Sequence, residues 1–72
     1  MDILVEVALE LNRAETKHGP MLSRHDAYAT ILEEVDEFWD EVKKREPSPA
    51  AMKEELIQIA AMAVRAVKDL KL

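Results

Sequence analysis

A chain of 72 residues forms one domain at most, and because it contains no cysteine, disulfides and thiolate zinc sites are excluded. Fifteen acidic against ten basic residues give a net charge of -5, which argues against non-specific binding to nucleic acid, since that needs a concentrated basic surface. A chain this short buries only about 60% of the surface that its unfolded form exposes. We therefore expect self-association, as a homodimer or homotetramer, to stabilise it.

The N-terminal segment lacks the features of a targeting or membrane sequence. It begins MDILVEVALE, with no basic region before its apolar residues, so it does not resemble a secretory signal. No apolar run approaches the roughly 18 residues needed to cross a bilayer. We expect a cytoplasmic protein that does not bind membranes.

The first predicted helix covers residues 2–17. Gly19 is expected just past its end, where glycine commonly terminates a helix. The second predicted helix follows Ser23, a good N-cap, with Asp26 completing an acidic variant of the capping box. It is expected to continue to about residue 46.

The third predicted helix begins with Ser48 as its cap and Pro49 in its first turn, a preferred place for proline. It runs to about residue 70. Because the connection before it is short, the second and third helices are expected to form an antiparallel hairpin. The prediction is an all-α domain of residues 1–72, in which three helices complete a helical bundle by oligomerisation.

Apolar residues cover so much of the third helix that it should be buried from more than one direction. With three helices in the chain, the extra cover is expected from a partner copy. On the second helix the apolar residues form one stripe at helical spacing, made by Ala27, Ile31, Val35, Phe38 and Val42 and widened by Leu32 and Trp39.

Carboxylates lie beside these apolar faces. Glu34, Glu37 and Glu41 form a row along one edge of the stripe, and Glu55 lies within the apolar face of the third helix. An unpaired carboxylate in apolar surroundings is unfavourable, and like charges one turn apart repel. If the hairpin brings these faces together, Glu34, Glu37 and Glu55 converge, and a hard divalent cation with oxygen ligands would resolve both problems.

Each of these carboxylates also has an ordinary structural interpretation. Glu37 and Glu41 are equally well explained as parts of a solvated face. Glu55 could be neutralised by Arg65, by Lys43 or by a lysine of a partner chain. Glu15, on the inner face of the first helix, is at least as readily explained by structural pairing.

Two segments, ILEEVDEFWDEV and KEELIQIAAMAV, resemble the MazG-like, all-α nucleoside triphosphate pyrophosphohydrolases. That family carries Glu-Glu-x-x-Glu on one helix and Glu-x-x-Asp on the next. The first half is intact in residues 33–37. The second half begins at Glu55, but Gln58 replaces the expected aspartate. The Lys17-His18-Gly19 exit of the first helix is also similar, and the likeness extends from about residue 6 to residue 70.

The resemblance implies Mg²⁺-dependent hydrolysis of a nucleoside or deoxynucleoside triphosphate to the monophosphate and pyrophosphate, with Mn²⁺ as a possible substitute. Glu34, Glu37 and Glu55 would bind the metal, and Gln58 would hold the fourth position. The carboxylate that positions the attacking water would be Glu33 or Glu37. Family members form dimers or dimers of dimers.

Basic side chains must meet the triphosphate of such a substrate. The interpretation assigns this role to Lys17, His18 and Lys43, while the other basic candidates are Arg13, Lys44, Arg65 and Lys68. Trp39 could stack on a base, although a large aromatic residue at this spacing more commonly packs in a core. Met52 and Met62 are expected to fill core gaps.

Two other functions remain open. The Gln58 substitution allows a MazG-like fold that has weakened catalysis and acts as a nucleotide-binding regulatory dimer. A helical interaction module without any metal is the third possibility.

Overall fold

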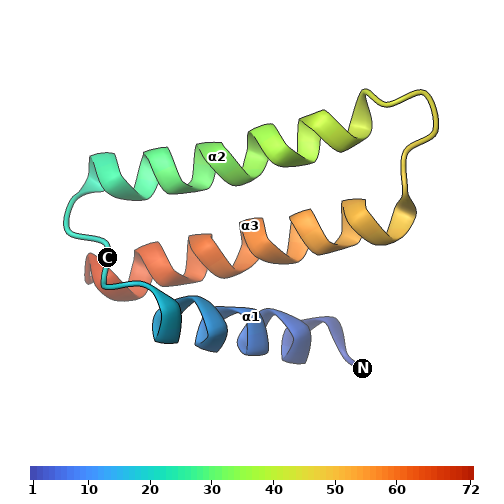
Figure 1. Cartoon of the computed structure of the whole chain (residues 1–72). Helices are drawn as coiled ribbons and strands as arrows, with labels where there is room; N and C mark the ends of the chain where they lie inside the picture. Colours follow the sequence, from blue (N-terminus) through green and yellow to red (C-terminus); the bar gives the residue numbers. More distant parts are fainter.

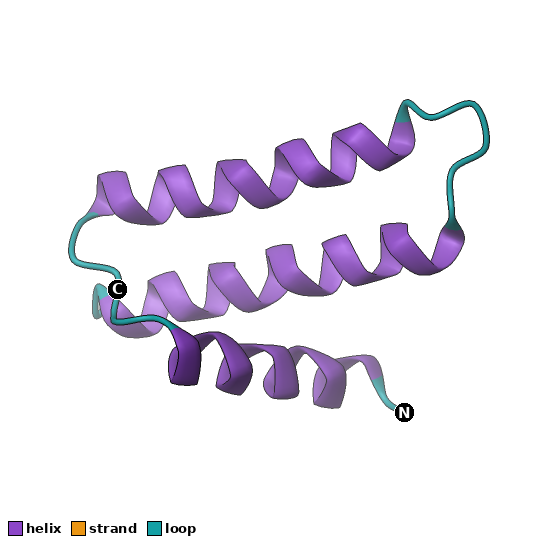
Figure 2. Cartoon of the chain, in the orientation of Figure 1, coloured by secondary structure: helices purple, strands orange, loops and turns teal.

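The computed structural model describes residues 1–72 and contains three α-helices and no strand (Figure 2). They are α1 (Ile3–Lys17), α2 (Arg24–Val42) and α3 (Pro49–Asp69). The prediction of an all-helical chain with three helices is confirmed. None of the helices combines the length and the apolar character that crossing a bilayer requires.

Helix α3 occupies the middle of the structure (Figure 1). It packs against both α1 and α2, whereas α1 and α2 do not approach each other closely. Figure 1 shows α2 and α3 side by side, with the chain reversing direction between them. Residues of all three helices line a groove between α1 and α2, and those of α3 form its floor.

Side chains at the N-termini of the helices satisfy backbone N–H groups that have no partner inside a helix. The Asp2 Oδ1 accepts from the N–H of Leu4 at 2.7 Å. At the start of α2, the Ser23 Oγ accepts from the N–H of Asp26 at 3.0 Å, and the Asp26 carboxylate accepts from the N–H of Leu22 at 3.2 Å. The predicted Ser23 cap of α2 is therefore in place, whereas the Asp26 carboxylate binds the N–H of Leu22 and not that of Ser23 as a capping box would.

The third helix begins as predicted, with Ser48 as its cap and Pro49 in the first turn. The end of α2 differs from the prediction, because the helix stops at Val42 and not at residue 46. The Glu41 carboxylate accepts hydrogen bonds from the Ser48 N–H at 2.7 Å and from the Lys44 Nζ at 2.6 Å. These bonds hold the connecting segment folded back over the end of α2, a path that a continuing helix could not take.

Gly19 also differs from its predicted role as a helix terminator. The C-cap of α1 is His18, in an extended conformation, and Gly19 does not adopt a positive φ. Its carbonyl oxygen instead accepts a hydrogen bond from the Arg65 Nη2. The Asp69 carboxylate accepts from the Met21 N–H at 2.8 Å, so the last turns of α3 hold the connection between α1 and α2.

The hydrophobic core of a single chain is thin. It consists of four alanines and two methionines, and no large side chain is fully buried. The core residues are Ala14, Met21, Ala27, Ala61, Met62 and Ala66. The expectation that Met62 fills the core is confirmed, and Met52 is half-buried.

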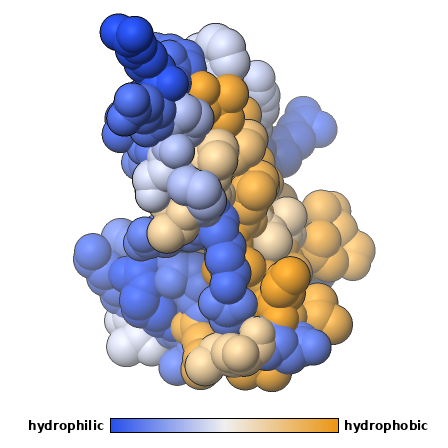
Figure 3. Space-filling view, turned by 90° about the vertical axis from the view of Figure 1, so that its right-hand side faces the viewer, coloured by the Kyte–Doolittle hydropathy of each residue, from blue (hydrophilic) through white to orange (hydrophobic).

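Much of the apolar surface stays uncovered within one chain. On α2 the residues Leu32, Val35 and Trp39 are exposed, and Trp39 has 57% of its surface accessible. The expectation that Trp39 packs in a core is therefore wrong for the single chain, because α2 has α3 alone as a neighbour and its far side meets nothing. Hydrophobic residues gather along one side of the molecule and hydrophilic residues along the other (Figure 3).

Candidate metal centre

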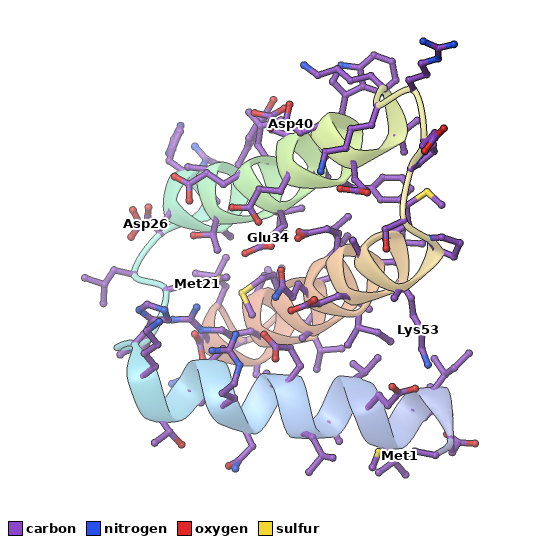
Figure 4. All side chains as sticks on the ribbon, turned by 45° about the vertical axis from the view of Figure 1, so that its right-hand side comes forward. Met1, Met21, Asp26, Glu34, Asp40 and Lys53 are labelled. Carbon is purple, nitrogen blue, oxygen red and sulfur yellow. The ribbon has the colours of Figure 1, made fainter.

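Three carboxylates meet between α2 and α3. Glu34 and Glu37 lie one turn apart on α2, and Glu55 lies on α3. One carboxylate oxygen of each lies within 4.8 Å of those of the other two. Glu34 extends from the side of α2 that faces α3 (Figure 4). The packing of α2 on α3 thus brings together the three carboxylates that the sequence predicted to converge.

The electrostatics of this cluster favour a positive charge. Burial, and then the negative charge of Glu37, raise the pKa of Glu34 to about 7. Burial and the proximity of Glu37 also raise the pKa of Glu55. Both shifts show that a second negative charge is unfavourable here.

No basic side chain neutralises the cluster, since none of the three carboxylates forms an ion pair. The two residues of this chain that could have neutralised Glu55 have other partners. Arg65 lies 3.6 Å from the Asp69 carboxylate, and Lys43 lies 3.1 Å from that of Asp40. The alternative that Glu55 is paired within its own chain is therefore wrong.

Gln58 lies next to this cluster, one turn after Glu55 on α3. In the amide orientation that satisfies its hydrogen bonding, the Gln58 nitrogen donates to Glu34 Oε2 at 2.9 Å and to Glu55 Oε2 at 3.2 Å. Gln58 thus bridges one carboxylate from each helix. Rotation of the amide by half a turn would present its carbonyl oxygen to the same point.

Binding of a single divalent cation would require the three carboxylates to move closer together. Mg²⁺ lies about 2.0–2.1 Å from each ligand oxygen, so two opposed ligands are about 4.2 Å apart. In an octahedral site at least two of the three pairs that three ligand oxygens form are adjacent, about 2.9 Å apart. The oxygens of Glu34, Glu37 and Glu55, which lie within 4.8 Å of one another, would therefore have to draw closer together to bind one ion. Glu37 is exposed, so its side chain is free to make this movement.

The other acidic residues of α2 separate into two environments. Glu41 is 8% exposed, and its hydrogen bonds to Ser48 and Lys44 make it part of the corner between α2 and α3. The interpretation of Glu41 as a solvated carboxylate is therefore wrong. Glu33 is exposed and lines the groove between α1 and α2.

The groove beside the carboxylate cluster has a volume of about 320 Å³. Its basic lining residues are Arg13 and His18 from α1 and its C-cap, and Arg65 from the floor. The others are Glu10, Ala14, Thr30, Glu33, Glu34 and Met62. His18 was among the predicted substrate-binding residues, and Arg13 and Arg65 were among the other basic candidates.

The remaining basic candidates lie outside this groove. Lys43 and Lys44 pair with carboxylates at the far end of α2, and Lys17, in the last turn of α1, is exposed. Lys68 pairs with Glu15 at 2.9 Å, so the expectation of structural pairing for Glu15 is confirmed.

Sequence reasoning did not identify Glu10. Its carboxylate accepts from the Arg13 Nε at 2.8 Å, and both residues line the groove. The three-residue spacing between them in α1 was the available signal.

Comparison with models of known protein families, with curated proteins and with solved structures gives no match to this chain. The functional argument therefore depends on the residues and their arrangement.

Proposed function

We propose that this chain is a MazG-like pyrophosphohydrolase that hydrolyses a nucleoside or deoxynucleoside triphosphate to the monophosphate and pyrophosphate. The observation that carries the proposal is the cluster of Glu34, Glu37 and Glu55, which joins two helices and lacks any cationic partner. These are the carboxylates of the Glu-Glu-x-x-Glu and Glu-x-x-Gln segments.

Glu34, Glu37 and Glu55 would hold Mg²⁺, and Gln58 would offer its carbonyl oxygen as a fourth ligand after rotation of the amide. A metal ion in this position neutralises charge on phosphate oxygens and lowers the pKa of a bound water molecule. The phosphates of the substrate would lie in the adjoining groove, against α1.

Glu33 is the better candidate for the carboxylate that orients the attacking water. Glu37 contacts Glu34 and Glu55, so its oxygens are committed to the cluster. Glu33 lies in the groove beside Glu34 and has no ion-pair partner. Because Glu33 is not one of the residues that would bind the metal, it can accept a proton from water without removing a metal ligand.

We also propose that the active unit is a homodimer or homotetramer in which the exposed faces of α2 and α3 meet those of another copy. On α2 the exposed apolar residues follow helical spacing, as Tyr28, Leu32, Val35 and Trp39. On α3 they are Leu56, Val64 and Val67. A single chain whose core is built from alanine and methionine gains most from burying these faces.

A dimer with weakened catalysis is the second candidate, and the Gln58 amide is the observation that favours it. The amide donates to Glu34 and Glu55, so it offsets part of the negative charge that a metal ion would otherwise neutralise. Incubation with Mg²⁺ and a panel of nucleoside triphosphates separates the two functions. The enzyme releases pyrophosphate, whereas the regulatory dimer binds a nucleotide without turnover.

A further inference from the structure

Helix α3 lies in the middle of the structure, yet one side of it is not covered by α1 or α2. Leu56, Ala63 and Val67 are exposed there, and Ala60 is half-buried. These four residues follow one another at intervals of four, three and four, so they form one stripe along the helix. Gln58 lies two residues from Leu56 and from Ala60, which is about 200° of rotation around the helix. The stripe of α3 therefore faces away from the carboxylate cluster.

The exposed apolar stripe of α2 lies on the same side of the molecule. Val35, at its centre, is two residues from both Glu33 and Glu37, so the stripe and these carboxylates point in opposite directions. On the hydrophobic side of the molecule (Figure 3), residues of all three helices line a groove of about 450 Å³. Its apolar lining includes Ile3 and Val7 of α1, Phe38 of α2, and Leu56 and Ala60 of α3. The two stripes and this groove form the apolar face of the chain.

The exposed surface of the single chain is larger than that of a typical monomer. It measures 5327 Å², whereas a folded monomer of 8.2 kDa exposes about 4,500 Å². The excess of roughly 800 Å² equals the area that each partner loses in a protein–protein interface of standard size. The radius of gyration is 12.7 Å, against about 11 Å for a compact domain of 72 residues. Both values indicate that one further interface of standard size completes the fold.

A second copy of this chain is suited to the apolar face. The stripe of α2 carries large side chains, among them Tyr28, Leu32 and Trp39, whereas that of α3 contains the small Ala60 and Ala63. In a contact with two-fold symmetry, the large side chains of α2 in each copy pack against the small ones of α3 in the other. Charge favours the same arrangement, because each chain has a net charge of -5 and this contact keeps the two acidic sides apart.

We propose that two copies of this chain associate through their apolar faces, and that both carboxylate clusters then lie on the outer sides of the dimer. The inference rests on the self-association in the proposed function and deepens it in two ways. It fixes a dimer with a single interface, because the excess surface matches one contact. It also makes each candidate metal site complete within one chain, since the partner copy covers the side opposite the carboxylates.

Ala63→Glu tests the interface, because the side chain is exposed in a single chain and the substitution should leave the monomer folded. Light scattering should give the mass of two chains for the wild type and 8.2 kDa for the variant, since an unpaired charge in the interface weakens dimerisation at least about 100-fold. The single tryptophan, Trp39, is 57% exposed in one chain, so its emission should move to longer wavelength in Ala63→Glu. Ala29→Glu makes the same change on α2 outside the apolar face and should alter neither measurement.

Calorimetric titration of Mg²⁺ into the monomeric variant tests whether each site is complete within one chain. The wild type and Ala63→Glu should bind Mg²⁺ with equal affinity and equal stoichiometry per chain. Loss of Mg²⁺ binding in an Ala63→Glu variant that is still helical by circular dichroism would show that the partner completes the site, and would overturn this part of the inference.

Three masses would overturn the proposed interface: a wild-type monomer, a wild-type tetramer, or a dimer that persists in Ala63→Glu. If Ala63→Glu does not fold, dilution of the wild type replaces it. The emission of Trp39 should then shift as the mass falls, and a constant emission while the mass halves would place the interface elsewhere. These measurements do not depend on metal, so a wild-type dimer that binds no Mg²⁺ would contradict the metal centre and leave the interface standing.

Discussion

In the amide orientation that satisfies its hydrogen bonding, the Gln58 nitrogen lies 2.9 Å from Glu34 Oε2, so a side chain of α3 donates to a carboxylate of α2 where the two helices bring their negative charges together. The same amide reaches Glu55 at 3.2 Å. Gln58 therefore stabilises the carboxylates through its nitrogen and can offer an oxygen to a cation by rotating.

Gln58→Asp is expected to increase the affinity for Mg²⁺ about tenfold in the absence of nucleotide, because cation affinity rises with the number of charged ligands. Without metal the variant should unfold at a lower temperature, since it loses a donor to Glu34 and Glu55 and gains a fourth negative charge. Calorimetric titration of Mg²⁺ measures the first effect. Equal affinity and stoichiometry in both proteins would show that residue 58 does not reach the metal.

Mg²⁺ or Mn²⁺ is expected to raise the melting temperature, and Glu55→Gln should remove most of that gain. The substitution also removes a like charge from the cluster, so the variant without metal should melt at or above the temperature of the wild type. Differential scanning calorimetry with and without Mg²⁺ measures both effects. Glu54→Gln, at the exposed neighbouring position, is the control, and a full metal response in Glu55→Gln would place the ion elsewhere.

Stability should depend on pH through Glu34. Its pKa is raised from 4.5 to about 7, so between these values the folded protein keeps a proton that the unfolded chain releases. The free energy of unfolding therefore falls as pH rises through this window and levels off above it.

The melting temperature without metal should fall by several degrees from about pH 5 to about pH 7.5, since about 1 kcal/mol shifts the melting temperature of so small a domain by about 4–8 °C. Glu34→Gln is expected to flatten the profile, whereas Glu33→Gln, at an exposed neighbouring position, should retain it. An unchanged slope in Glu34→Gln would assign the pH dependence to another group.

Val35→Glu places a charge in the middle of the exposed apolar stripe of α2. If this stripe is buried between copies, the variant should be monomeric at micromolar concentration and less stable than the wild type, because an unpaired charge in an interface is unfavourable. Light scattering measures the mass, with Ala29→Glu as a control on an exposed position of α2 outside the stripe. A monodisperse wild-type monomer would overturn the proposed assembly.

The local rules of helix formation were readable from the sequence, because Ser23, Ser48 and Pro49 act through neighbours close in the chain. Convergence of Glu34, Glu37 and Glu55 was also predictable, since helical periodicity and a hairpin determine which faces meet. The end of α2 was not, because it depends on the hydrogen bond from Ser48 to Glu41, seven residues apart.

Contacts between residues far apart in the chain could not be predicted from the sequence for the same reason. The hydrogen bond from Arg65 to Gly19 joins positions 46 residues apart, and no pattern in either segment predicts it. The groove beside the metal cluster likewise arises because α1 and α2 pack on α3 and not on each other. Its lining residues could be identified only once the three helices were placed.

The central claim is hydrolysis between the α- and β-phosphates, and analysis of the products tests it most directly. The protein is incubated with Mg²⁺ and each of a panel of nucleoside and deoxynucleoside triphosphates, and the products are separated by ion-exchange chromatography. At least one substrate should give the monophosphate and pyrophosphate in equal amounts, with a rate that Glu33→Gln lowers about 10²–10⁴-fold while Mg²⁺ binding is retained. No turnover of any nucleotide, or release of a diphosphate and inorganic phosphate, would contradict the account.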